Sequence, residues 1–309
     1  MTSAPHAPLP DPLPFAEVEA GGRTLAVRGW DEPNGQQVAL MVHGLGGSSL
    51  NWTDLSAQLR DDLTTLAVDL PGFGYSPPPA DGDYTLSASA GMLAELIDRR
   101  DTGPVHVFGN SMGGAIALQL AARFPSRVAS VTLISPALPQ FTAQRANVHL
   151  PVLAVPGIGE RAMERFLRTP AHVRAQATID ACYADPAQMP PQRLAEAVAE
   201  VERRDSLDYP ATAFLQSLRA LMATYRDSSP NRPWRLAERV ECPVLVIYGR
   251  QDQLVNSRAA HRVTRHFPQP HVVVLPNSGH VAQMEHPELV AAAWRSFQSK
   301  KLGTEPVPT

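Results

Sequence analysis

A serine stands in a glycine-flanked turn between an apolar segment and a helical one. The segment reads VHVFGNSMGGAIALQLAARF, and it places Ser111 between Gly109 and Gly113. A sharp strand-to-helix turn needs glycine on both sides of its serine, because the tight backbone leaves no room for Cβ atoms. Such a turn holds the hydroxyl out at the end of the strand. The pattern therefore favours Ser111 as a nucleophile.

A serine hydroxyl is a weak nucleophile at neutral pH, so this chemistry also needs a base and an acid that orients the base. Asp252 stands three residues beyond the end of the apolar segment PVLVIYG, and His280 follows the apolar segment HVVVL in the setting Ser-Gly-His. The chain order Ser, Asp, His matches the order in open α/β sheets whose strands carry such a triad. The sequence predicts a catalytic triad of Ser111, Asp252 and His280.

A second aspartate, Asp69, also follows an apolar segment. It opens the stretch DLPGFGYS, whose proline and glycines indicate a structured turn, and it precedes the serine in the chain. We therefore expect Asp69 to stabilise a turn and Asp252 to orient the histidine.

Acyl chemistry also requires donors for the oxyanion that develops on the substrate. The segment ALMVHGLGG ends in a glycine-rich loop after a strand, and this loop can aim a backbone N–H at the site. We expect the N–H groups of Leu45 and Met112 to form the oxyanion hole. A phosphate cradle is the alternative, but neither G-x-G-x-x-G nor the lysine of a phosphate-binding loop is present.

Short apolar segments alternate with helical ones along most of the chain. The apolar segments are nearly continuous, as strands buried on both faces of a parallel sheet require. This alternation predicts an α/β fold with a mostly parallel, doubly wound sheet, preceded by a hairpin that turns at Gly21 and Gly22. The expected strands are Val38–Val42, Leu66–Val68, Val105–Phe108, Val128–Ile134, Val244–Tyr248 and Val272–Leu275.

One interval interrupts the alternation. Residues 137–232 show several proline-punctuated amphipathic helices and no strand pattern, which indicates a helical lid inserted into the sheet domain. We expect the core to comprise residues 15–136 and 233–299, with flexible tails at 1–14 and 300–309. One apolar helix face combines Phe214, Leu218, Leu221, Met222 and Tyr225. The substrate pocket is expected to be lined by Phe214, Leu218 and Val281, although a plain helical core is the more common role for any single residue of this helix face.

Composition excludes several classes of function. The net charge is −3, with 27 Lys and Arg against 30 Asp and Glu and no long basic run, so a nucleic-acid partner is not expected. No apolar stretch approaches the roughly 20 residues of a membrane span, and no leader pattern is present, which favours a cytoplasmic protein. The two cysteines, Cys182 and Cys242, suggest neither a disulfide framework nor a metal site. We expect no cofactor and no metal, and the oligomeric state is not defined.

Together the motifs HGLGG, DLPGFGYS, GNSMGG, GRQD and GHVAQMEHP resemble the α/β-hydrolase superfamily, in its lid-bearing serine hydrolase branch. The resemblance covers residues 15–297 apart from the lid. It implies Ser111 as nucleophile, Asp252 as acid, His280 as base, and Leu45 with Met112 as the oxyanion hole. Dehalogenases and epoxide hydrolases of this branch use an aspartate nucleophile, so Ser111 argues against both activities.

Two hydrolytic activities stay open. We expect cleavage of a small to medium apolar carboxylic ester through an acyl-enzyme. The alternative is hydrolysis of a carbon–carbon bond in a meta-cleavage-type vinylogous diketone, since GNSMGG resembles those enzymes, although they usually carry Trp where Val281 stands and H-G-x-G-P-G in the early loop. Arg161, Arg165 or Arg168 would then bind a substrate carboxylate, or they line a solvated helix face. A third interpretation is a ligand receptor that has kept the fold without turnover.

Overall fold

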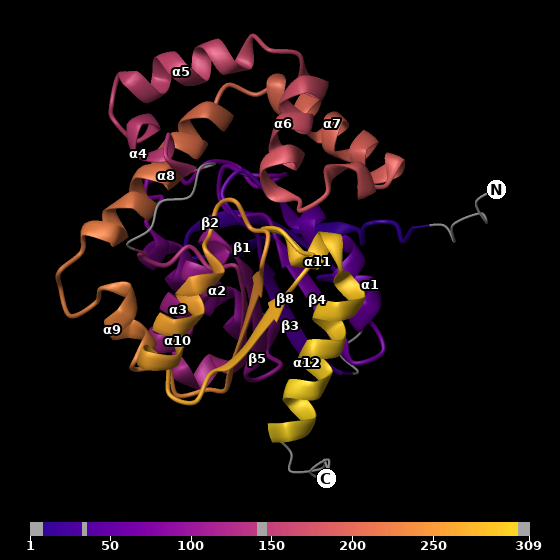
Figure 1. The fold of residues 1–309 in the computed structure, drawn as a ribbon, viewed down its shortest axis with the longest axis vertical. Coiled ribbons are helices and arrows are strands. Elements are labelled where there is room, and N and C mark those ends of the chain that lie inside the picture. Colours follow the sequence, from indigo (N-terminus) through magenta and orange to yellow (C-terminus); the bar gives the residue numbers. More distant parts are fainter. Residues whose placement is uncertain (1–8, 33–35, 141–146, 302–309) are drawn as a thin grey trace.

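The computed structural model describes residues 9–32, 36–140 and 147–301, which form one eight-stranded sheet covered by helices (Figure 1). The strand order is β1-β2-β4-β3-β5-β6-β7-β8. The strands are β1 Phe15–Ala20, β2 Arg23–Arg28, β3 Gln37–Val42, β4 Leu63–Val68, β5 Val105–Asn110, β6 Val128–Ile134, β7 Val244–Gly249 and β8 His271–Leu275.

The sheet is antiparallel at one edge and parallel elsewhere. Strands β1 and β2 form the expected hairpin, with Ala20 opposite Arg23 across the turn, and β2 pairs with β4 in antiparallel orientation. Strands β3 to β8 pair in parallel. The α/β-hydrolase fold expected from the sequence is confirmed, and the carboxyl ends of its parallel strands share one edge of the sheet.

Both faces of the sheet are buried, which explains why its strands are continuously apolar. Along β7, for example, Val246 belongs to one hydrophobic cluster, whereas Leu245 and Ile247 belong to the cluster on the opposite face. Helices from both sides supply the rest of each cluster. A parallel strand that is covered on both faces cannot alternate polar and apolar residues.

The helices of the core fall on opposite faces of the sheet (Figure 1). Residues of α2, α3 and α10 pack into one cluster, and residues of α1, α11 and α12 pack into the other. The sequence patterns predict helices at the positions of α2, α3, α10 and α12, but none at the position of the short helix α1. The bounds are α1 Thr53–Leu59, α2 Leu86–Arg100, α3 Met112–Arg123, α10 Ala260–His266, α11 Ala282–Glu285 and α12 Pro287–Lys301.

The chain between β6 and β7 is helical wherever it forms a regular element within the described residues. Figure 1 shows α5, α6 and α7 above the edge of the sheet at the top of the view. We call this part of the chain, residues 137–232, the insertion. Its helices are α4 Leu150–Leu153, α5 Ile158–Leu167, α6 Ala171–Cys182, η4 Pro186–Gln188, α7 Pro191–Asp205 and α8 Pro210–Arg226, and α9 Pro233–Ala237 follows it.

Helix α8 packs through the apolar face that the sequence indicates. Leu218 and Leu221 are buried, and Phe214 and Met222 are half-buried. Tyr225, the penultimate residue of the helix, is 36% exposed. The apolar face therefore buries its middle part and leaves its carboxyl-terminal end open.

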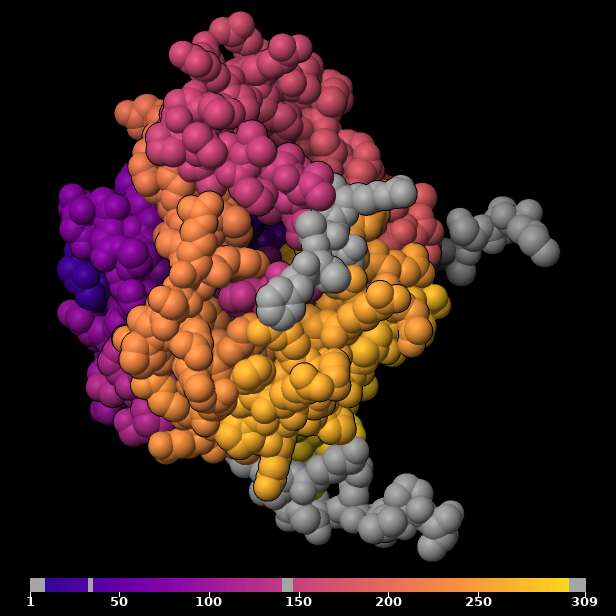
Figure 2. Space-filling model, turned by 60° about the vertical axis from the view of Figure 1, so that its left-hand side comes forward, coloured from indigo at the N-terminus to yellow at the C-terminus, as the bar shows by residue number. Residues whose placement is uncertain are grey.

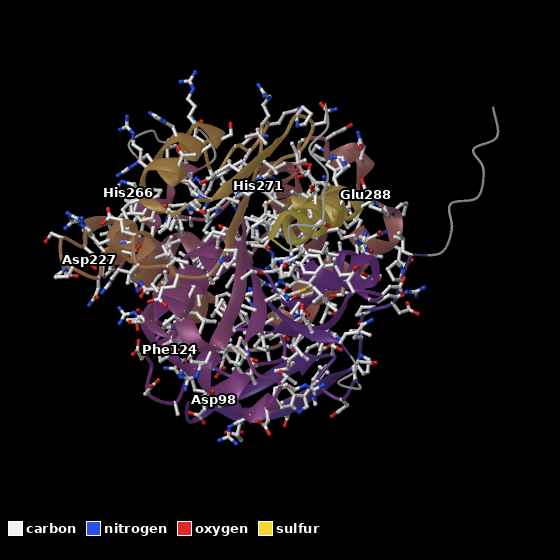
Figure 3. The ribbon with its side chains drawn as sticks, turned by 90° about the horizontal axis from the view of Figure 1, so that it is seen from below. Asp98, Phe124, Asp227, His266, His271 and Glu288 are labelled. Atoms are coloured by element: carbon white, nitrogen blue, oxygen red, sulfur yellow. The ribbon has the colours of Figure 1, made fainter. Side chains whose placement is uncertain are left out.

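Figure 3 shows the molecule from below, with side chains projecting around its outline and Asp98 and Glu288 among those labelled. Within the described ranges, no helix has both the length and the apolarity needed to cross a membrane. Helix α12 continues to Lys301. The expected tails, 1–14 and 300–309, lie outside the described residues at positions 1–8 and 302–309.

Candidate active site

Ser111 sits in a strained turn between β5 and α3. Its backbone angles are φ 54° and ψ −117°, a conformation that non-glycine residues rarely adopt. Neighbouring backbone holds the turn: Ser111 N donates to Ile134 O at 3.0 Å, and Ser111 O accepts from Ala137 N at 2.9 Å. The side chain is only half-buried. The turn therefore presents the hydroxyl at the carboxyl end of the sheet.

Both glycines beside the serine are required by close packing. A Cβ atom on Gly113 would lie 2.1 Å from Val42 O, and one on Gly109 would lie 2.4 Å from Gly113 O. These contacts are with backbone atoms, which cannot move aside as a flexible side chain can. The steric reason that the sequence suggests for the two glycines is confirmed.

Replacing Gly113 by alanine is expected to lower the free energy of unfolding by about 1–3 kcal/mol or more, because the new methyl group overpacks against β3. Gly91 in α2 provides a matched control, since a Cβ there meets nothing within 4 Å. Gly91→Ala should be neutral or stabilise the protein by about 0.5–1 kcal/mol. Denaturation in urea measures both changes, and equal stabilities of the two variants would contradict the argument.

The structure pairs the predicted base with the predicted acid. His280 Nδ1 lies 2.9 Å from Asp252 Oδ2, and both side chains are buried. The other carboxylate oxygen, Asp252 Oδ1, accepts hydrogen bonds from Leu254 N at 2.7 Å and Val255 N at 2.8 Å. The carboxylate thus has a fixed orientation, with one oxygen held by the loop and the other facing the imidazole.

The surroundings of Asp252 lower the pKa of its carboxyl group. Burial alone raises the pKa of a carboxyl group, but the charge of His280 and the hydrogen bonds from His280 and Val255 outweigh burial, so the pKa of Asp252 is lowered. The residue therefore stays ionised at neutral pH. An ionised partner at Nδ1 favours the tautomer whose Nε2 can accept a proton.

Asn110 connects the serine turn to the histidine loop. Its Nδ2 donates to His280 O at 3.0 Å and to Ile134 O at 3.1 Å. The residue before the nucleophile thereby holds the backbone of the base. Within the described residues no hydrogen bond joins Ser111 Oγ to the His280 ring, a contact that in such enzymes often tightens only when substrate binds.

The glycine-rich loop after β3 lies against the serine. A Cβ on Gly44 would lie 3.1 Å from Ser111 Cβ. Met112 is the first residue of α3, so its N–H has no acceptor within the helix. Arg204 of α7 reaches this loop from the insertion and donates to Gly46 O at 2.8 Å. The loop that carries Leu45 is thus held by the insertion as well as by the core.

Asp69 stabilises a turn, as the sequence predicts. Its Oδ1 accepts from Ser49 N at 2.6 Å and its Oδ2 accepts from Tyr75 N at 3.0 Å. The side chain is buried, and a Cβ on Gly74 would lie 2.1 Å from its carboxyl carbon. Asp69 therefore holds two loops together.

His43 is buried in a single tautomer. Its Nε2 accepts from Leu70 N at 3.0 Å, so Nδ1 carries the proton and donates to Gly44 O at 2.7 Å. Burial lowers the pKa of His43 and outweighs the opposite effect of nearby Asp69. The folded protein therefore favours the neutral ring.

This burial predicts an acid-dependent loss of stability. The unfolded chain binds a proton on His43 at pH ~6.5, whereas the folded protein binds it only at lower pH. The contribution of neutral His43 to the free energy of unfolding is therefore complete above about pH 6.5 and declines below it. Between about pH 8 and about pH 5.5 the wild type should lose more free energy of unfolding than His43→Gln, whose side chain does not titrate. Urea denaturation at several pH values gives the slope of the free energy of unfolding against pH for each protein. Identical slopes would refute the lowered pKa of His43.

The three residues expected to line the pocket lie in different surroundings. Phe214 faces the glycine loop, since a Cβ on Gly46 would lie 3.4 Å from its ring. Leu218 is fully buried. Val281 packs in a small cluster with Ile179, Tyr183 and Met189. Figure 2 shows the surface hollowed between the pink helices of the insertion and the orange residues of α8.

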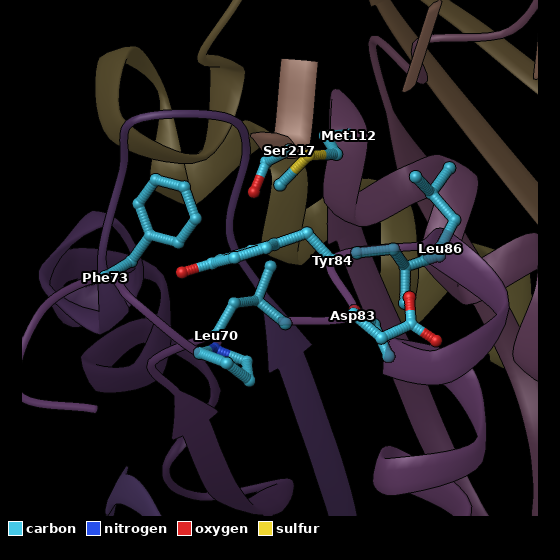
Figure 4. A pocket seen from close by; sticks show the side chains of 10 residues that line it. Leu70, Phe73, Asp83, Tyr84, Leu86, Met112 and Ser217 are labelled. Carbon is cyan, nitrogen blue, oxygen red and sulfur yellow. The ribbon is translucent and has the colours of Figure 1, made fainter. Parts of the chain in front are cut away.

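A small cavity lies behind Met112. In Figure 4, side chains from Leu70, Phe73, Tyr84 and Ser217 surround it together with Met112. The space open to the centre of a water molecule is ≈ 10 Å³, room for about one water. This cavity is too small for an acyl chain, so the substrate must bind elsewhere.

Three residues at the site do not stand out in the sequence. Asn110 and Glu285 lie inside recognised motifs, but a single sequence does not show which backbone groups their side chains bind. Arg204 follows a run of charged residues that suits a solvated helix face. Only their contacts with segments distant in the chain identify them.

The family described as alpha/beta hydrolase fold matches residues 38–287. The chain belongs to this family and has its fold. Three relatives indicate the range of activities within it.

The first relative is the dihydrolipoyllysine-residue acetyltransferase component of the acetoin cleaving system of Cupriavidus necator, 30% identical over 88% of this chain. The match spans 65% of that protein, less than two thirds of its length. The second is a 2-hydroxy-6-oxononadienedioate/2-hydroxy-6-oxononatrienedioate hydrolase of Klebsiella pneumoniae, 27% identical over 88% of this chain and 90% of that protein. The third is lipase 1 of Psychrobacter immobilis, 27% identical over 84% of this chain and 76% of that protein.

Proposed function

We propose that the protein is a serine hydrolase that cleaves a small to medium apolar carboxylic ester through an acyl-enzyme. In this proposal Ser111 is the nucleophile, His280 is the base, and Asp252 orients the base. The observation that carries the proposal is the buried pair of His280 and Asp252 at the edge of the sheet where the Ser111 turn ends. The similarity to a lipase agrees with an ester substrate.

The arrangement suits acyl transfer in two steps. Ser111 Oγ attacks the carbonyl carbon while its proton passes to His280 Nε2, and the N–H groups of Leu45 and Met112 bind the resulting oxyanion. The C–O bond to the alcohol then breaks, and the alkoxide takes the proton from His280. Water next attacks the acyl-enzyme, His280 accepts its proton and returns it to Ser111, and the carboxylic acid leaves.

The insertion is proposed to act as a lid over this site. Its helices lie above the edge where the triad residues stand (Figure 1), and Phe214 faces the proposed oxyanion loop. Phe214, Leu218 and Val281 are all at least half-buried in apolar surroundings. A lid of this kind would favour apolar acyl groups, with the lining supplied by α8 and by the loop after β8.

Hydrolysis of p-nitrophenyl butyrate tests the proposal. An acyl-enzyme mechanism predicts a burst of p-nitrophenol equal to the concentration of active sites when deacylation is slower than acylation. A fluorophosphonate should label Ser111 covalently, and peptide mapping would identify the site. The absence of both acylation and labelling would refute the serine hydrolase.

A second candidate is the hydrolysis of a carbon–carbon bond in a vinylogous diketone. The Klebsiella pneumoniae relative, named for such dienedioate and trienedioate substrates, supports it. In that case one of Arg161, Arg165 and Arg168, which are all exposed on α5 or at its end, would bind a substrate carboxylate. Turnover of a yellow meta-cleavage product, and its loss when these arginines are replaced, would favour this candidate over the ester hydrolase.

A further inference from the structure

The backbone of His280 is held from two sides. Its N–H donates to Cys182 O, the last residue of α6, at 2.7 Å, and its C=O accepts from Asn110 Nδ2 at 3.0 Å. One partner belongs to the insertion and the other to the serine turn. The position of the proposed base therefore depends on the insertion as well as on the sheet.

Glu285 strengthens the connection to the insertion. Its Oε1 accepts at 2.8 Å from the N–H of Gly279, the residue directly before His280. Its Oε2 accepts from Ala184 N at 2.8 Å, two residues beyond α6. A single carboxylate thus joins the histidine loop to the insertion through two charge-assisted hydrogen bonds, which are stronger than neutral ones.

The two joined segments are also in direct contact. A Cβ on Gly279 would lie 2.4 Å from Cys182 O and 2.7 Å from Ala184 N. On the other side of His280, Val281 is buried with Ile179 and Tyr183, which belong to α6 or follow it. The segment from Cys182 to Ala184 therefore packs directly against the histidine loop.

We propose that Glu285 is a positioning residue that fixes His280 by joining its loop to residues 182–184 of the insertion. This inference rests on the proposed function, because it assumes that His280 is the base. Loss of the carboxylate would leave the partly buried N–H groups of Gly279 and Ala184 without their acceptor, and so loosen the backbone next to His280. The imidazole would then spend less time in line with the serine and the ester carbonyl.

The test compares Glu285→Ala, Glu285→Gln and the control Glu288→Ala. Misplacing a base by about 1 Å costs on the order of 10²-fold in rate, so kcat for p-nitrophenyl butyrate should fall about 10²-fold in Glu285→Ala with little change in KM. Glu285→Gln keeps one acceptor oxygen, and its kcat should fall about tenfold. Glu288 is exposed in the first turn of α12 (Figure 3), and its replacement should leave kcat unchanged.

Active-site titration separates this inference from the proposed function. If the fluorophosphonate fails to label the wild type, the serine hydrolase itself is refuted. If the wild type is labelled and Glu285→Ala keeps the wild-type kcat per titrated site, Glu285 has only a structural role and the inference is overturned, even where the melting temperature falls. Should Glu285→Ala fail to fold, the isosteric Glu285→Gln decides, because an unchanged kcat in that variant would also overturn it.

Discussion

Replacing Ser111 by alanine is expected to lower kcat for p-nitrophenyl butyrate by about 10⁶-fold, because the covalent step disappears with its nucleophile. The residual rate would come from the proposed oxyanion donors and from substrate binding. Folding should be preserved, since alanine keeps the backbone interactions of residue 111 with Ile134 and Ala137. KM should change little if the hydroxyl contributes mainly to the transition state.

Steady-state kinetics with active-site titration measure this effect. Ser87, which is exposed in the first turn of α2, provides the control, and Ser87→Ala should behave as the wild type. A Ser111→Ala protein that hydrolyses the ester at the wild-type rate would refute the mechanism. If the wild type and Ser111→Ala bind the ester with equal affinity and the wild type does not turn it over, a ligand receptor would instead be favoured.

Much of the fold follows from the sequence because its strands are buried on both faces. Burial on both faces makes a segment such as Val244–Gly249 apolar throughout, and the helices between such segments are long enough to show a clear period. Helix α1 could not be predicted in this way. It has only seven residues and starts directly after a 3-10 turn, so its pattern is too short to show a helical period.

The shared location of the proposed catalytic residues could be predicted because each follows a strand of the same sheet. The position of Ser111 after β5, of Asp252 after β7 and of His280 after β8 brings them to one edge through topology alone. The residues that orient them could not be predicted in this way. Glu285 binds Ala184, 101 positions away, and Arg204 binds Gly46, 158 positions away, and such contacts depend on how the insertion packs.

The insertion contacts the proposed site in two distinct ways. Its helix α8 places the ring of Phe214 against the glycine loop. Its segment after α6 and its helix α7 instead hold backbone groups of the histidine loop and of the glycine loop. If the insertion moves during catalysis, the segment from Cys182 to Ala184 is the part whose displacement would also displace the base.

Asp252→Asn should lower kcat by about 10⁴-fold without a comparable loss of stability, because it changes the tautomer of the base. Asp252 Oδ1 accepts two backbone N–H groups, from Leu254 and Val255, so an asparagine must keep its oxygen at that position. Its NH₂ group then faces His280 Nδ1 and donates to it. The ring can accept this hydrogen bond only with its proton on Nε2.

An imidazole protonated at Nε2 cannot accept the proton of Ser111, so attack on the ester fails although every heavy atom stays in place. Asp252→Ala is the matched comparison, since it removes the carboxylate without imposing the wrong tautomer and leaves the amides of Leu254 and Val255 without an acceptor. We expect Asp252→Ala to be the less stable of the two proteins, by about 1–3 kcal/mol in urea denaturation. A kcat for Asp252→Asn within tenfold of the wild type would show that another group orients His280.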